Sequence, residues 1–178
     1  MSRAYWVAPL PPMHTADGTA LANSTTLTDI SPAPSITIPA NLLEAGSELE
    51  LWAQGNFSTT GTPTLLIGFY YGGVAGVALG ATTAVTTGSG AASWPFIAHY
   101  RGVVRASGSS GSILGQGYCV LGTSLTAGQV NMLPATAAAR TVTIDTTTAK
   151  AITVGAQWGT ASSSNTITLN DISVKLVS

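Results

Sequence analysis

The chain has 178 residues, of which only 7% are charged, against roughly 25% in an ordinary globular protein. Its formal net charge is −1, so there is no surplus of Lys and Arg to neutralise a phosphate backbone, which argues against nucleic acid as a partner. Hydrophobic residues make up 45% of the chain, too many for a highly charged disordered segment. A single cysteine excludes a disulfide-stapled scaffold and a multi-cysteine metal site.

The first 34 residues differ from the remainder of the chain. They hold five of the nine prolines, which remove backbone donors and make regular strand pairing hard to sustain. We therefore predict an extended arm over residues 1–34, with a short strand near Thr25–Ile30, followed by one β domain over residues 35–178. Tyr5, Trp6 and Met13 are large apolar groups on this arm, which indicates that it lies against its own domain or a neighbour. No apolar stretch follows Met1, so no signal peptide is expected.

Apolar residues alternate with polar ones over much of residues 35–178, which predicts half-buried strands. Strands with this alternation are expected around Ile36–Ile38, Leu49–Phe57, Val142–Ile144, Ile152–Trp158 and Ile167–Leu176. In the last of these, apolar residues change from odd to even positions, which predicts a β-bulge at Asn170–Asp171.

Four more strands are predicted, separated by connections rich in Gly, Ser and Thr. They cover Leu65–Tyr71, Val74–Leu79, Pro95–Ala106 and Ser112–Gly122. Ala127–Leu133 is taken as a loop, and Pro134–Arg140 as one helical turn. Many short strands without helices favour an all-β fold, an antiparallel, jelly-roll-like β-sandwich.

Residues 65–85 carry no charge, and Gly68, Gly72, Gly76 and Gly80 recur every four positions. That spacing is typical of a glycine face in a membrane helix, which leaves a transmembrane reading open. We favour two buried strands, because Gly72-Gly73 is a turn signal and no Lys or Arg flanks the segment. No membrane partner is expected.

His99, Arg101 and Arg105 fall on one face of a predicted strand. A histidine with two arginines could bind an anion or a carboxylate, but a polar outer face with the arginines at a subunit contact is the favoured interpretation. Glu48 and Glu50 also share a strand face, so they could form a paired-carboxylate site or two solvated side chains.

The remaining reactive groups do not assemble a recognisable catalytic or metal motif. Cys119 shares its face with Ile113 and Leu121, which indicates a small buried hydrophobe. His14 is expected to be exposed or at an interface. The sequence has no calcium loop and no phosphate loop. We therefore expect a protein that is not an enzyme and has no cofactor or metal.

Several blocks of the sequence resemble a family of virion structural proteins from tailed bacteriophages of actinobacterial hosts. These blocks are Phe57–Gly73, Gly111–Gly117, Arg140–Ala151 and Val154–Gly159, and the similarity runs from about Asp17 to the C-terminus. Members of that family are capsid decoration or minor tail proteins. The matching blocks are framework and turn residues, and neither Cys119 nor Ala127–Leu133 belongs to them.

The resemblance implies a non-enzymatic part of the phage particle, made in the host cytoplasm. The leading expectation is a capsid decoration (cement) protein on the head surface, whose partners are the major capsid protein and itself, as a homotrimer. Tyr5, Trp6 and Met13 would contact the capsid or a neighbouring subunit. The alternative is a minor tail protein with a receptor- or glycan-binding role, in which Trp52 and Trp94 would stack on a sugar.

Overall fold

The structure is a computed structural model that describes residues 7–9 and 14–177, and in these residues the chain forms two antiparallel sheets. We call them the large and the small sheet. The large sheet contains β1 (Val7–Pro9), β2 (Leu21–Ala22), β5 (Glu48–Ser58), β9 (Trp94–Ala106), β10 (Gly111–Gly122), β11 (Gly128–Leu133), β12 (Thr141–Ile144) and β14 (Thr166–Val177). The small sheet contains β3 (Thr28–Asp29), β4 (Ile36–Ile38), β6 (Thr64–Tyr71), β7 (Val77–Ala81), β8 (Val85–Thr86) and β13 (Lys150–Trp158).

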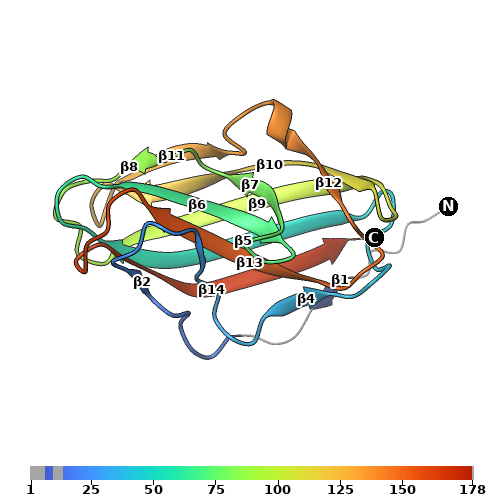
Figure 1. Ribbon diagram of the computed structural model, residues 1–178, viewed down its shortest axis with the longest axis horizontal. Helices are drawn as coiled ribbons and strands as arrows, with labels where there is room; N and C mark the ends of the chain where they lie inside the picture. The colour runs from blue at the N-terminus through green and yellow to red at the C-terminus, as the bar shows by residue number, and fades with distance from the viewer. Residues whose placement is uncertain (1–6, 10–13, 178) are drawn as a thin grey trace.

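The two sheets pack face to face, and the chain crosses between them repeatedly (Figure 1). Strand order is β1-β14-β5-β9 in the large sheet and β3-β13-β6-β7 in the small sheet. This is the pairing of an eight-stranded jelly roll, which confirms the predicted fold class. Three further strands extend the large sheet beyond β9. β10 pairs with β9, and β11 and β12 pair with different parts of the other edge of β10.

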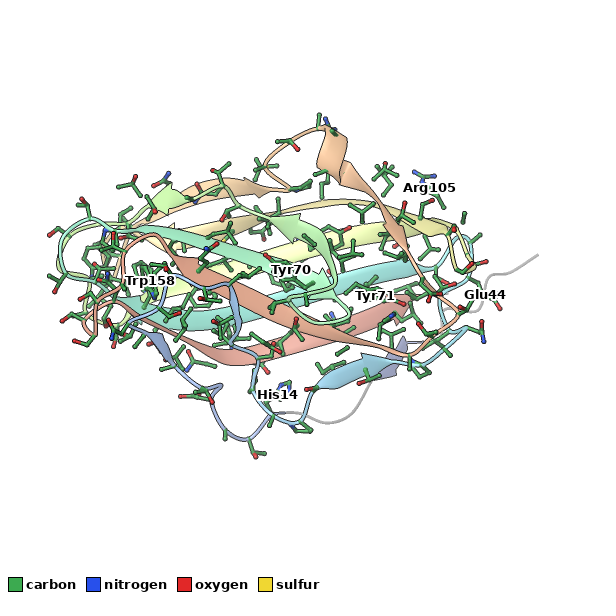
Figure 2. The ribbon with its side chains drawn as sticks, viewed as in Figure 1. His14, Glu44, Tyr70, Tyr71, Arg105 and Trp158 are labelled. Carbon is green, nitrogen blue, oxygen red and sulfur yellow. The ribbon has the colours of Figure 1, made fainter. Side chains whose placement is uncertain are left out.

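The core lies between the sheets and follows the alternation in the sequence. Along β5, Leu49, Leu51, Ala53 and Phe57 are buried while their neighbours are partly or fully exposed. Trp158, predicted on the buried face of β13, is fully buried and lies near one end of the sandwich in Figure 2. The pairing of β14 with β5 shifts register between Leu169 and Asp171, so the predicted bulge is confirmed.

The charge-free segment 65–85 forms strands. β6 ends at Tyr71, the turn contains Gly72 and Gly73 with positive φ angles of 89° and 79°, and the chain returns as β7. Positive φ values suit glycine, which explains the Gly-Gly pair at this turn. The strand predicted from Val74 begins only at Val77. Gly76 still belongs to the turn, because its backbone N–H donates a hydrogen bond to the Gly73 carbonyl oxygen. In the part of the chain that the structure describes, no helix is long and apolar enough to cross a membrane.

Residues 14–34, predicted as part of an arm ahead of the domain, belong to the sandwich. Leu21 and Ile30 are buried in its core, β2 pairs with β14, and β3 pairs with β13. The strand predicted near Thr25–Ile30 corresponds to β3. His14, predicted to be exposed or at an interface, has a side chain only 1% exposed and lies against the fold (Figure 2). The proline-rich composition of this segment therefore does not mark a boundary between an arm and the domain. Single Leu and Ile residues between the prolines supply core contacts that make the segment part of the sandwich.

Two connecting segments were also predicted from sequence. Ala127–Leu133, predicted as a loop, contains the edge strand β11, whose short alternation of Val130 and Met132 with polar residues is too brief to identify it by itself. The turn predicted in Pro134–Arg140 is present as a 3₁₀ turn, η1 (Ala138–Arg140).

Candidate functional site

The outer face of the large sheet gathers most of the chemically distinctive side chains in the described residues. Alternation along β5, β9 and β10 points one set of residues into the core and the other set away from it. Strand register arranges the outward set in rows across β14, β5, β9 and β10. The rows run Asp171-Gln54-Ile97-Val120, Ser173-Trp52-His99-Tyr118, Lys175-Glu50-Arg101-Gln116 and Val177-Glu48-Val103-Leu114.

One row is aromatic. The ring centroids of Trp52 and His99 are 4.2 Å apart, and those of His99 and Tyr118 are 5.5 Å apart. Directly beyond Tyr118, the register brings Met132 of β11 to the same face. One face of the Trp52 indole is thus directed at His99 instead of solvent.

The adjacent rows carry ion pairs. Arg101 Nη2 donates to Glu48 Oε2, His99 Nε2 lies 3.3 Å from Glu50 Oε1, and Lys175 Nζ lies 3.8 Å from Glu50 Oε2. A hydrogen bond from the Trp52 indole N–H, followed by His99 and Lys175, lowers the pKa of Glu50. Glu48 and Glu50 are therefore held by different cations, and this arrangement does not favour the paired acid and base that their spacing left open.

A depression of about 590 Å³ lies beside these ion pairs. Arg101, Arg105 and Arg140 line it, and the remaining lining residues are Glu48, Val103, Leu114, Gly115 and Gln116. Figure 2 marks Arg105 near the end of the sandwich where β9 turns into β10. Of the residues predicted together, Arg101 and Arg105 reach the depression, whereas His99 belongs to the aromatic row.

Arg140 was missed by sequence reasoning. It is the last residue of η1, and Thr141 next to it pairs with Leu114 of β10, which also lines the depression. This pairing joins residues that are 27 positions apart, and no local sequence pattern predicts it. The only available signal was that Arg140 is one of six Lys and Arg residues in the chain.

A second feature of the outer face is an exposed apolar patch, which we define as Ile97, Val120, Leu125, Val130 and Met132. Val120 pairs with Ile97 on one side and with Val130 on the other, so these side chains lie on one face. Leu125 is 70% exposed, while Val130 and Met132 are each 63% exposed. Ile97, Val120 and Leu125 also line a shallow hollow of about 250 Å³.

The two tryptophans expected to stack on a glycan lie on opposite faces of the large sheet. Trp94 pairs with Phe57 at the edge of the core and packs against it edge-on, with ring centroids 6.3 Å apart. Trp52 is on the outer face. The structure therefore does not bring them into one stacking platform.

Other sequence candidates fall outside this face. Cys119 points into the core, and burial raises the pKa of its thiol to about 12, which suits the predicted small hydrophobe. Tyr5, Trp6 and Met13 lie outside the described residues. Within residues 7–9 and 14–177, no three His, Cys, Asp or Glu side chains gather closely enough to hold a metal ion.

Comparisons with known proteins add no assignment. No protein-family model matches this chain, and no curated protein matches it.

Proposed function

We propose that this protein is a non-enzymatic structural component of a tailed-phage particle, a capsid decoration (cement) protein that binds the head shell as a symmetric oligomer. The observation that carries the proposal is the apolar patch on the outer face of the large sheet. The sequence blocks that resemble phage virion proteins supply the setting, and the jelly roll is an architecture that viral capsid domains use.

The apolar patch is the feature that a lasting protein contact would use. Three of its side chains are more than 60% exposed: Val130 and Met132 lie on β11, and Leu125 lies in the loop before it. Exposed apolar residues that form a contiguous patch mark protein interaction sites, whereas scattered ones do not. Only 7% of the chain is charged, so a tight contact at this patch desolvates few charges.

The same region suits association between copies of the chain. β11 lies at the end of the large sheet's strand order, and an edge strand leaves unpaired backbone groups available to another chain. Closed rings of identical subunits are the usual form of such assemblies, and a trimer fits the three-fold positions of a capsid lattice. The proposed partners are therefore other copies of this chain and the major capsid protein.

The patch is tested with the triple substitution Leu125→Ser, Val130→Ser and Met132→Ser in the full chain. Its control is Leu42→Ser, which removes an apolar side chain that is 37% exposed and lies outside the patch. We expect the triple variant to remain folded but to lose oligomerisation in analytical ultracentrifugation and co-sedimentation with phage heads. Unchanged assembly and unchanged head binding in the triple variant would contradict the proposal.

The N-terminal residues need a separate test. Deleting residues 1–34 would remove Leu21 and Ile30 from the core and unfold the protein for reasons unrelated to attachment. Substituting Tyr5, Trp6 and Met13 together with Ala keeps the chain length and removes only the proposed contact groups. We expect weaker head binding with an unchanged melting temperature, and head binding equal to wild type would rule out their role.

Particle imaging decides between the head and the tail. Labelled protein on the head lattice is the expected result. Density only at the tail would favour a minor tail protein instead and would overturn the decoration role.

A further inference from the structure

The depression on the outer face concentrates positive charge in a protein that has little of it. Three of the six Lys and Arg residues, Arg101, Arg105 and Arg140, line this one hollow. Among the described residues that line it, Glu48 is the one acidic residue, and it forms an ion pair with Arg101. Among the described residues, the guanidinium groups of Arg105 and Arg140 have neither an ion pair nor a hydrogen-bond acceptor.

Folding does not account for this placement. Arg105 and Arg140 are both exposed, and they come from different elements, β9 and the end of η1. In the described residues neither arginine has an acidic partner, and both line the same depression, so this placement favours an anionic partner. The planar fork of each arginine matches the two oxygens of a carboxylate or a phosphate.

The uncharged residues that line the depression indicate which class of anion it binds. Val103 and Leu114 line the depression together with the arginines, and the Gln116 amide adds a neutral donor and acceptor. A free oxyanion would use the arginines and leave the apolar floor uncovered. A nucleic acid needs many phosphate contacts, and the chain has a formal net charge of −1. At about 590 Å³ the hollow has the volume of a pocket for a sizeable ligand and far exceeds a single ion.

We propose that this depression binds an acidic segment of a partner protein, whose Asp or Glu carboxylates pair with Arg105 and Arg140 while an aliphatic side chain covers Val103 and Leu114. The site is distinct from the apolar patch, because the two share no lining residue. It goes beyond the proposed decoration role, since an acidic segment of any partner, in the head or the tail, would satisfy the same chemistry.

The probe is a fluorescein-labelled peptide of alternating Glu and Leu, measured by fluorescence anisotropy with the full-length protein. The test variant is the double substitution Arg105→Ser and Arg140→Ser. Its matched control is Lys150→Ser with Lys175→Ser, which removes the same charge from positions outside the depression. A peptide with Lys in place of Glu and inorganic phosphate as a competitor complete the design.

We expect the Glu-Leu peptide to bind the arginine variant about tenfold more weakly than wild type, and the lysine variant within about twofold of wild type. The Lys-Leu peptide should not bind, and phosphate at an equal number of charges should displace only a small part of the Glu-Leu peptide.

Three results would each overturn the inference. They are an absence of binding to wild type, an equal loss of affinity in both double variants, and complete displacement by phosphate, which would make this a site for small oxyanions. If circular dichroism shows that the serine variant is unfolded, Arg105→Lys with Arg140→Lys replaces it. That variant keeps the charge but loses the bidentate fork, so affinity equal to wild type would overturn the guanidinium–carboxylate geometry.

Discussion

The Nδ1 atom of His14 lies 3.6 Å from the Oδ1 atom of Asp171, which joins the start of the N-terminal segment to the bulge of β14. On the other side of the ring, Nε2 donates a hydrogen bond of 3.1 Å to the carbonyl oxygen of Pro34. One imidazole, 1% exposed, therefore holds both ends of residues 14–34 against the sandwich. This relationship explains how a proline-rich stretch stays ordered with only two short strands, β2 and β3.

We predict that His14→Ala destabilises the protein by about 0.5–1.5 kcal/mol, because the segment loses the hydrogen bond from a buried imidazole to the Pro34 carbonyl. The loss should be local first. Hydrogen exchange should accelerate at the Gly18 amide, which bonds the Leu169 carbonyl at 2.8 Å, more than at amides in β9. Thr15→Ala, at an exposed neighbouring position, is the control and should leave both measurements unchanged. Unaltered protection at Gly18 in the His14 variant would show that the ring does not anchor the segment.

We predict a steric coupling between Gly115 and Tyr100. A Cβ atom at Gly115 would lie 2.1 Å from the Tyr100 hydroxyl oxygen, and Tyr100 is fully buried. Gly115→Ala should therefore lower the free energy of unfolding by about 1–3 kcal/mol through overpacking. In a Tyr100→Leu background the same substitution should have a smaller effect, and urea unfolding of the four proteins measures this difference. Strict additivity of the two substitutions would refute the clash.

We predict that Glu50 makes stability depend on acid pH. Its pKa in the folded protein is lowered from the ordinary 4.5, mainly by the Trp52 indole N–H. A lowered pKa means that Glu50 stabilises the fold above pH 4.5 and that this contribution disappears as pH falls through the folded-state pKa. Thermal melts from pH 7 to pH 3 should show wild type above Glu50→Gln at neutral pH and the two converging in acid.

Trp52→Phe provides the matched control for Glu50, because it keeps an aromatic ring beside His99 and removes only the indole donor. Its melting curve should show a weaker loss of stability in acid than wild type shows. A difference between wild type and Glu50→Gln that stays constant over the whole pH range would disprove the prediction.

We predict that Cys119 reacts with thiol reagents only when the protein opens. The side chain is fully buried, and burial raises the pKa of the thiol to about 12, so almost no thiolate exists near pH 8. Ellman's reagent should detect no thiol in the native protein and one per chain in denaturant, because this is the only cysteine. Fast stoichiometric labelling of the native protein would contradict the buried position.

The alternation of apolar and polar residues predicted the strands correctly wherever a strand has one solvent-exposed and one buried face. β5, β9 and β14 follow this rule, and the change of parity near Asn170 located the bulge because a one-residue slip turns every later side chain over. The same alternation predicted the class of fold, an antiparallel β-sandwich. It could not predict which strands pair or which sheet each strand joins, because alternation carries no information about pairing.

The candidate site was less accessible to sequence reasoning. Arg101 and Arg105 share a strand and could be placed together, but Arg140 reaches them through the pairing of β12 with β10. The apolar patch depends in the same way on β11 pairing with β10 across a turn. Leu21 and Ile30 entered the core from a segment without strong periodicity. In each case the missing information was a long-range backbone pairing.

The first and last strands lie side by side, with Val7 opposite Val177 in the antiparallel pair β1 and β14. Val7 and Val177 therefore lie at the same end of this strand pair. A force that pulls the two ends apart would act on one end of this strand pair and would break its residue pairs one after another. It would not load all of them at once in shear. Pulling on both ends of the chain would thus separate β1 from β14 first, while the other strand pairs of the two sheets remained closed.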